Sequence, residues 1–274
     1  MSRSPLQLSY DAHSGYHLSV YVTFNKASLN CFTRNKTFKS NVIEGIERNW
    51  SGRYPMNSEL KQACEDFFLW QKTRRRFSEQ DATDLSDFKK SEETSFHLSE
   101  LHLRELPFHV KLHEDILSGL QNPRIVFLKR LFHGKQRPIP IFVKKPRILP
   151  SHVASGLFRR FWGFFRTGQI ESFGYNWSRN FPGFAVINDL RNSHRLRQIS
   201  AHEAGHLFGI GDAYDAWYRF FYAAPGTQDY MMHYNTQVHA QEIAMLIRAY
   251  VKNKAQFFLG NLTCEIFLRA CCGN

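Results

Sequence analysis

The sequence contains few cysteines and no long hydrophobic run. Its 274 residues include five Cys, an odd number without the spacing of a zinc ribbon, which favours a reducing compartment over a disulfide framework. No apolar run reaches the roughly 18 residues that a transmembrane helix requires. Residues 1–10 are polar and lack the apolar stretch of a signal peptide. We therefore expect a cytoplasmic protein, or an effector secreted by a leaderless route.

Acidic side chains are absent from one long segment. Residues 116–170 contain no Asp or Glu, although the chain as a whole carries 24 of them and a net charge of +12. The basic side chains of this segment account for nearly all of that net charge: Arg124, Lys129, Arg130, Lys135, Arg137, Lys144, Lys145, Arg147, Arg159, Arg160 and Arg166. Basic surfaces with interleaved aromatic residues are typical of binding to phosphates, nucleic acid or anionic lipid.

The remaining composition is that of a folded protein. Hydrophobic residues make up 43% of the chain and aromatic residues 15%, which excludes a disordered polypeptide. Apolar periodicity predicts strands at residues 16–24, 108–112, 124–128, 139–143 and 183–190, and helices at 40–50, 60–70, 192–208 and 238–257. Prolines around 139–143 favour a short or edge strand. We expect one α+β domain over residues 1–274, with a polar insertion or linker at 71–99.

A metal-site motif lies near the end of the chain. His202 and His206 are four residues apart, so on a helix both imidazoles project from one face and can hold one Zn²⁺. Glu203 lies beside the first histidine, where its carboxylate can take a proton from a zinc-activated water as general base. The sequence thus predicts two zinc ligands and a catalytic carboxylate within one helical turn.

A third ligand requires a reversal of the chain. Gly209 stands where such a reversal belongs, because glycine tolerates the left-handed conformation that ends helices. Asp212 then supplies a carboxylate oxygen and leaves a fourth position open for water, which is the arrangement of catalytic zinc. Asp215, Asp229 and Glu242 remain alternative third ligands, the first through a wider turn and the others through arrangements found in other zinc peptidases.

The motif His202-Glu203-x-x-His206-x-x-Gly209-x-x-Asp212 resembles that of the metzincin metalloproteases, in the variant with aspartate as third ligand known from snapalysin-type members. Met232-His233-Tyr234 resembles the methionine turn of astacin-like and serralysin-like enzymes. The resemblance implies a twisted mixed sheet with an active-site helix and a C-terminal helix, and a floor to the zinc site at Met232. It also implies that Tyr234 stabilises the oxyanion, and that an antiparallel edge strand at 183–190 lines the substrate cleft.

These observations predict a zinc-dependent endopeptidase that hydrolyses a protein or peptide substrate, with the basic segment steering an acidic one. The alternative is a protein that binds nucleic acid or an anionic membrane through residues 116–170 and carries a structural or vestigial zinc site. A nucleic-acid partner is the less favoured of these readings, because the basic segment is expected on the approach to the active site, where its charge would steer an acidic substrate.

Overall fold

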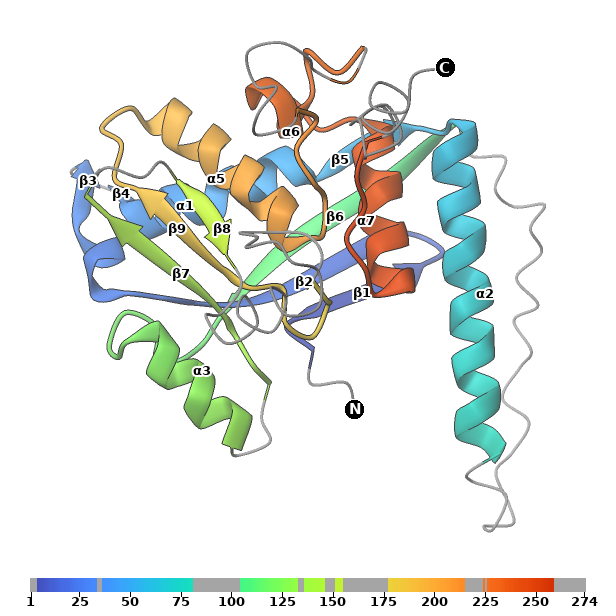
Figure 1. The fold of residues 1–274 in the computed structure, drawn as a ribbon, viewed down its shortest axis with the longest axis horizontal. Helices are drawn as coiled ribbons and strands as arrows, with labels where there is room; N and C mark the ends of the chain where they lie inside the picture. Colours follow the sequence, from blue (N-terminus) through green and yellow to red (C-terminus); the bar gives the residue numbers. More distant parts are fainter. Residues whose placement is uncertain are drawn as a thin grey trace, which may run out of the picture.

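The fold is described from a computed structural model of the whole chain. The structure describes residues 4–33, 36–80, 104–132, 136–145, 151–154, 177–214, 224 and 226–258, without the side chains of 33 and 75–80. Within these residues the chain forms an α+β fold built on one mixed sheet (Figure 1). Among them, no helix has the length and apolar character needed to cross a bilayer.

The sheet contains seven strands in the order β5-β6-β2-β7-β9-β8, with β1 paired to β2 beside this path. Parallel pairs join β2 to β6, β2 to β7 and β7 to β9, whereas β5, β8 and β1 pair antiparallel with their neighbours. A separate pair, β3 and β4, forms a small ribbon. The strands have these bounds: β1 Leu6–Asp11, β2 Gly15–Phe24, β3 Cys31–Thr33, β4 Lys36–Thr37, β5 Gly52–Pro55, β6 Glu105–Glu114, β7 Ile139–Lys144, β8 His152–Ala154 and β9 Phe184–Asn188.

The helices lie on both sides of this sheet. Contacts of α1 with α5 place these two helices on one face, whereas α3 packs against β7 across the sheet from α5 (Figure 1). Crossover handedness explains the separation: the connections from β2 to β6 and from β6 to β7 run in opposite directions, so right-handed crossovers put α1 and α3 on opposite faces. The helices have these bounds: α1 Phe38–Trp50, α2 Ser58–Gln80, α3 Pro123–Phe132, α5 Ser193–Leu207, α6 Met231–Tyr234 and α7 Ala240–Lys252, with a 3-10 turn, η1, at Lys26–Leu29.

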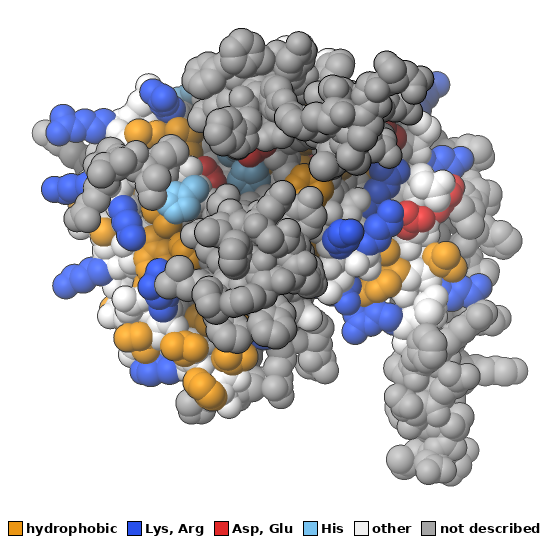
Figure 2. Space-filling model, in the orientation of Figure 1, with side chains coloured by type: hydrophobic (Ala, Val, Ile, Leu, Met, Phe, Trp, Pro, Cys, Tyr) orange, Lys and Arg blue, Asp and Glu red, His pale blue; other side chains and the backbone are white. Residues whose placement is uncertain are grey.

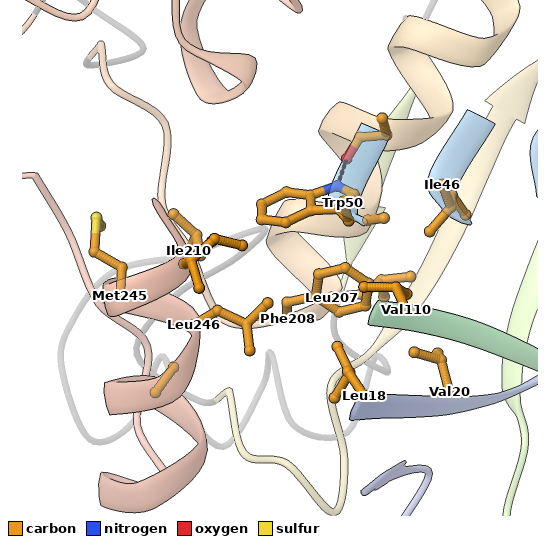
Figure 3. Close-up of a cluster of buried hydrophobic side chains, with 14 of the residues drawn as sticks. Leu18, Val20, Ile46, Trp50, Val110, Leu207, Phe208, Ile210, Met245 and Leu246 are labelled. Atoms are coloured by element: carbon orange, nitrogen blue, oxygen red, sulfur yellow. Dashed lines mark hydrogen bonds between the residues drawn. The ribbon is translucent and has the colours of Figure 1, made fainter. Parts of the chain in front are cut away.

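The hydrophobic core fills the space between the sheet and the helices α1, α5 and α7. Alternate residues of β2, such as Leu18 and Val20, are buried on the core side. Figure 3 shows them beside Trp50 of α1 and Phe208 at the end of α5, whose rings meet edge to face at 5.2 Å. The indole nitrogen of Trp50 donates to the Ala201 carbonyl at 2.8 Å, so the core also holds the backbone of α5.

Several predicted elements are confirmed with small shifts of their ends. The strands expected at 16–24, 108–112 and 183–190 correspond to β2, β6 and β9, and the helices expected at 40–50, 192–208 and 238–257 correspond to α1, α5 and α7. The helix expected at 60–70 is longer than predicted, because α2 continues to Gln80. The first part of the predicted insertion at 71–99 is therefore helical, and its remainder lies outside the described residues.

The predicted strand at 124–128 is wrong, because this segment lies within the helix α3. Pro123 occupies the first turn, where its missing N–H costs nothing. The Asn122 side chain accepts a hydrogen bond from the Arg124 amide at 3.0 Å and so stabilises the start of the helix. These helix-start signals outweigh the short run of β-branched residues that suggested a strand.

The two expectations about sheet edges have different outcomes. The segment 139–143, expected to be a short or edge strand, forms β7, which is short at six residues but lies inside the sheet between β2 and β9. Pro140 is tolerated there because β9 pairs with β7 only from Ile141 onward, so no amide is required at the proline on that side. The predicted edge strand at 183–190 is β9, which is also interior. Among the described residues, the antiparallel edge next to β9 is β8, a strand of three residues that is too short to show a period in the sequence.

Candidate metal centre

The helix α5 carries both motif histidines on its buried side. Asn192 caps its N-terminus by accepting a hydrogen bond from the Arg195 amide at 3.0 Å. His202 and His206 are buried one turn apart, with ring centroids 5.0 Å from each other. Helical spacing therefore brings the two imidazoles together as expected.

The chain reverses at Gly209, which has a φ of 92°. A Cβ at this position would come within 2.8 Å of the Trp177 ring, so both the conformation and the close packing require glycine. After the turn, the amide of Gly211 donates to the Gln256 carbonyl and the amide of Gln256 donates to the Gly209 carbonyl, each at 2.8 Å. These bonds hold the returning segment against the end of α7 and direct Asp212 toward the histidines.

Asp212 joins the two histidines in one cluster. Its Oδ1 atom lies 3.2 Å from Nε2 of His202 and 3.4 Å from Nε2 of His206. Ligands of a tetrahedral ion at 2.0–2.1 Å are separated by about 3.3–3.4 Å, so both distances fit one zinc ion held by these three atoms. Among the described residues, this triad is the one group of His, Cys, Asp and Glu side chains close enough to hold a metal ion.

The other nitrogen of each imidazole is held by a backbone carbonyl. Nδ1 of His202 lies 2.9 Å from the carbonyl oxygen of Met231, and Nδ1 of His206 lies 2.9 Å from that of Ile210. With a proton on Nδ1, each ring donates to its carbonyl and presents Nε2 toward Asp212, which is the nitrogen through which it could bind a metal ion. Carbonyl partners of this kind fix the tautomer and orientation of metal-binding histidines.

Met232 packs directly beneath the motif helix. A Cβ placed on Gly205, which lies between the two histidines in the sequence of α5, would overlap the Met232 sulfur and come within 3.0 Å of the Trp50 ring. Both Met231 and Met232 are fully buried. The structure therefore packs Met232 against the helix that carries both histidines.

The Asp212 carboxylate and the two imidazoles stabilise each other's charged forms. Burial acts against charge on His206, but the Asp212 carboxylate beside it raises the pKa of this imidazole to about 9. Burial alone would raise the pKa of the Asp212 carboxyl, yet the two imidazoles hold it well below its usual range. Asp212 is thus ionised at neutral pH, as a metal ligand must be, and a metal ion would compete with a proton on His206.

Glu203 lines the same cleft as the triad. The cleft has a volume of about 400 Å³ and its lining includes Glu203, His202, His206 and Asp212. Burial raises the pKa of the Glu203 carboxyl, an effect that the two neighbouring histidines oppose. Among the described residues, its buried Oε2 atom has no hydrogen-bond partner. A buried carboxylate oxygen without a partner beside a ligand triad is suited to accept a proton from a bound water.

Two of the alternative third ligands, Asp229 and Glu242, are not brought to the triad. Asp229 pairs with His239 at 3.1 Å, and Glu242 accepts hydrogen bonds from the Met232 amide at 2.9 Å and the His239 amide at 2.7 Å. Asp215 lies outside the described residues. Of the candidates whose positions are described, Asp212 is the carboxylate beside both histidines.

Tyr234 is the predicted site residue that the structure does not bring into the cleft. Its side chain is 66% exposed and stacks on His233, with ring centroids 4.1 Å apart. The reason is helical: Met232 and Tyr234 both belong to α6, where residues two apart point about 200° from each other. Because Met232 faces the core, Tyr234 faces away from it.

The cleft walls include residues that sequence reasoning missed. They come from the edge strand β8, from α5, from the segment after Asp212 and from the end of α6: His152, Arg195, Tyr214, His233 and Asn235. His152 is far from the motif in sequence and reaches the cleft only through the pairing of β8 with β9. Tyr214 and His233 could have been found from the sequence, because Tyr214 lies two residues after Asp212 and His233 directly follows Met232.

Comparison of the chain with models of protein families, with curated proteins and with solved structures finds no match. The functional argument therefore rests on the geometry of this cleft and on the motif that produces it.

Proposed function

We propose that this protein is a zinc-dependent endopeptidase of metzincin-like type. The observation that carries the proposal is the position of Glu203: a buried carboxylate oxygen without a partner among the described residues opens into the cleft that holds His202, His206 and Asp212. Two imidazoles and one carboxylate are the ligand types that zinc hydrolases use, with a position left for water.

His202, His206 and Asp212 would hold the ion through Nε2, Nε2 and Oδ1. Zinc, when bound, supplies Lewis acidity and lowers the pKa of water in its coordination sphere. The carbonyls of Met231 and Ile210 keep the two imidazoles oriented, and Met232 packs against Gly205 of the helix that carries them. The protein thereby maintains the site in advance of substrate binding.

Glu203 performs the proton transfers in this proposal. It accepts a proton from the water that attacks the peptide carbonyl carbon, and it delivers that proton to the amine nitrogen as the C–N bond breaks. Burial favours the neutral form of Glu203 after the first transfer, which keeps the proton available for the second. No other carboxylate of the described residues besides Asp212 lines the cleft.

The strand β8 offers a binding surface for an extended peptide. Among the described residues it is the edge strand beside β9, with which it pairs antiparallel, and Ser151, His152 and Val153 line the cleft. An extended substrate can add to this edge through main-chain hydrogen bonds, which position a scissile carbonyl without demanding a particular side chain. The edge expected at 183–190 is thereby replaced by β8, and the proposed mode of substrate binding is unchanged.

The test compares the wild-type protein with Glu203→Gln. Both proteins should bind one zinc ion, but only the wild type should cleave members of a peptide library, with the loss in kcat of the variant at least about 100-fold. A variant that retains wild-type cleavage contradicts the role of Glu203. A wild-type protein that binds zinc but cleaves neither peptides nor proteins contradicts the endopeptidase proposal.

The alternative of a structural zinc site makes a different prediction. Structural zinc is closed by four protein ligands, whereas the described residues bring three together. Zinc-bound protein should therefore bind a small hydroxamate, which needs an open coordination position. A zinc site that binds no such inhibitor would favour the structural alternative.

A further inference from the structure

Large hydrophobic side chains gather on the surface around α3. Of the exposed large hydrophobic residues in the described part of the chain, six lie within residues 116–132 and five are scattered elsewhere. The six, which we call the α3 ridge, are Ile116, Leu120, Ile125, Leu128, Leu131 and Phe132. Ile116 is 86% exposed and Phe132 is 82% exposed. Monomeric proteins rarely leave such a group in water without a function.

The ridge follows from how α3 meets the sheet. The helix buries Pro123 and Val126 against β7 and β2. Four of its other apolar side chains, Ile125, Leu128, Leu131 and Phe132, are exposed on the side that the sheet does not cover. Figure 2 shows the hydrophobic side chains gathered over α3 at the lower left of the molecule, with Lys and Arg side chains among them.

The charges around the ridge have one sign. Residues 116–132 contain no Asp or Glu, and Arg130 binds the preceding carboxylate, Asp115, through two hydrogen bonds of 2.7 and 3.1 Å. Exposed cations border the ridge at Lys26, Arg124 and Lys144. They surround a hollow of about 590 Å³ whose walls also include Leu120 and Phe142.

The arrangement combines protruding aliphatic groups with a positive border. We propose that the α3 ridge is a docking surface for an anionic phospholipid membrane. Ile, Leu and Phe side chains insert at the boundary between headgroups and acyl chains, while Lys and Arg attract anionic lipid. The hollow lined by Lys26, Arg124 and Lys144 is then positioned for lipid phosphate. Nucleic acid would satisfy the cations but would leave the aliphatic side chains exposed, so it fits this surface less well.

The ridge is separate from the metal centre. α3 lies on the sheet face opposite α1 and α5, so membrane docking need not cover the cleft that holds His202 and His206. The inference does not depend on the peptidase proposal, because it concerns other residues. Docking through α3 would determine where the protein acts, because it would hold the protein next to targets at a membrane surface.

The experiment measures co-sedimentation of the full-length protein with vesicles of phosphatidylcholine alone or with about 30% phosphatidylserine. The wild type should bind the anionic vesicles and not the neutral ones, and binding should weaken as NaCl rises from about 0.1 to about 0.5 M. The paired substitutions Leu128→Ser and Phe132→Ser should weaken vesicle binding at least about tenfold. Lys26→Glu with Lys144→Glu should weaken it comparably at low salt.

Leu69→Ser is the matched control, because Leu69 is 66% exposed on α2, away from the ridge. Zinc content and the thermal unfolding midpoint establish that each variant is folded. Absence of binding to anionic vesicles, or equal loss in the Leu69→Ser control, overturns the proposal. Binding of a DNA or RNA oligonucleotide that falls with the same ridge variants, without vesicle binding, also overturns it and assigns the surface to nucleic acid.

Discussion

Two pairs of histidines in this protein show how differently the same side chain can be placed. His17 and His109 are neighbours across the parallel strands β2 and β6, and their rings stack at 5.1 Å on the outer face of the sheet. His202 and His206 also have neighbouring rings, but each is buried and bound to a carbonyl, and Asp212 faces both. Proximity alone does not favour a metal site, whereas buried imidazoles that bind backbone carbonyls and share a carboxylate have the arrangement that could hold an ion.

The largest expected effect concerns the carboxylate that distinguishes the two pairs. Asp212→Ala should weaken zinc binding by more than about 100-fold. Loss of a residue that only positions a ligand lowers metal affinity by about 10- to 100-fold, and loss of a ligand itself should lower it further. Dialysis against zinc-buffered solutions measures the affinity. His17→Ala with His109→Ala is the control and should leave zinc affinity unchanged. Equal losses in the two variants would remove the distinction between the pairs.

The next effect concerns Glu242, which supports the segment beneath the metal site. It accepts hydrogen bonds from the amides of Met232 and His239, and burial raises its pKa to about 7 from 4.5. A folded-state pKa above the unfolded value means that the carboxyl group contributes most to stability below pH 4.5. That contribution declines as the pH rises to about 7, by up to about 3 kcal/mol.

Glu242→Gln cannot ionise, so the free energy of unfolding of this variant should lose the decline that the wild type shows between pH 4.5 and 7. Urea unfolding at several pH values in this range measures the difference. The amide cannot accept both backbone hydrogen bonds, so the variant should also be less stable at pH 4.5. An unchanged pH slope would show that Glu242 does not titrate in this window.

A smaller effect is expected from the close packing of α5 on Met232. Gly205→Ala should lower the free energy of unfolding by about 1–3 kcal/mol, because the added methyl overlaps the Met232 sulfur. Gly52→Ala is the matched control, since the nearest atom to a Cβ there lies 3.7 Å away. Thermal or urea unfolding of both variants tests this, and equal stability of the two would contradict the packing argument.

The smallest effect should follow from loss of one buried hydrogen bond. Trp50→Phe leaves the Ala201 carbonyl without its indole donor, at a cost of about 1 kcal/mol. Hydrogen exchange of the α5 amides should quicken, while zinc affinity should fall by no more than about tenfold. A loss of zinc binding as large as that of Asp212→Ala would show that Trp50 does more than brace the helix.

The parts of the fold that the sequence predicts are those with long, regular periods. β2 alternates from Tyr16 to Val22, and α5 has both a capping residue and a spaced motif. The five apolar and basic residues of 124–128 are too few to distinguish the period of a strand from that of a helix. The helix is indicated instead by its start signals, Asn122 and Pro123. β8 was missed because three residues carry no period.

The candidate site divides in the same way. His202, Glu203, His206, Gly209 and Asp212 are close in sequence, so helical spacing and one glycine turn are sufficient to predict their arrangement. The packing of Met232 against Gly205 and the arrival of His152 in the cleft depend on contacts between distant segments. Tyr234 was placed by analogy with a turn, whereas the chain forms a helical turn there and directs this side chain outward.

The central claim is that His202, His206 and Asp212 hold one zinc ion with a position left open. X-ray absorption spectroscopy at the zinc edge tests it most directly on the zinc-loaded wild-type protein. We expect one zinc ion per chain, with nitrogen and oxygen neighbours at about 2.0–2.1 Å and the outer-shell scattering of two imidazoles. Sulfur neighbours at about 2.3 Å, or failure to bind one zinc ion per chain, would contradict the claim.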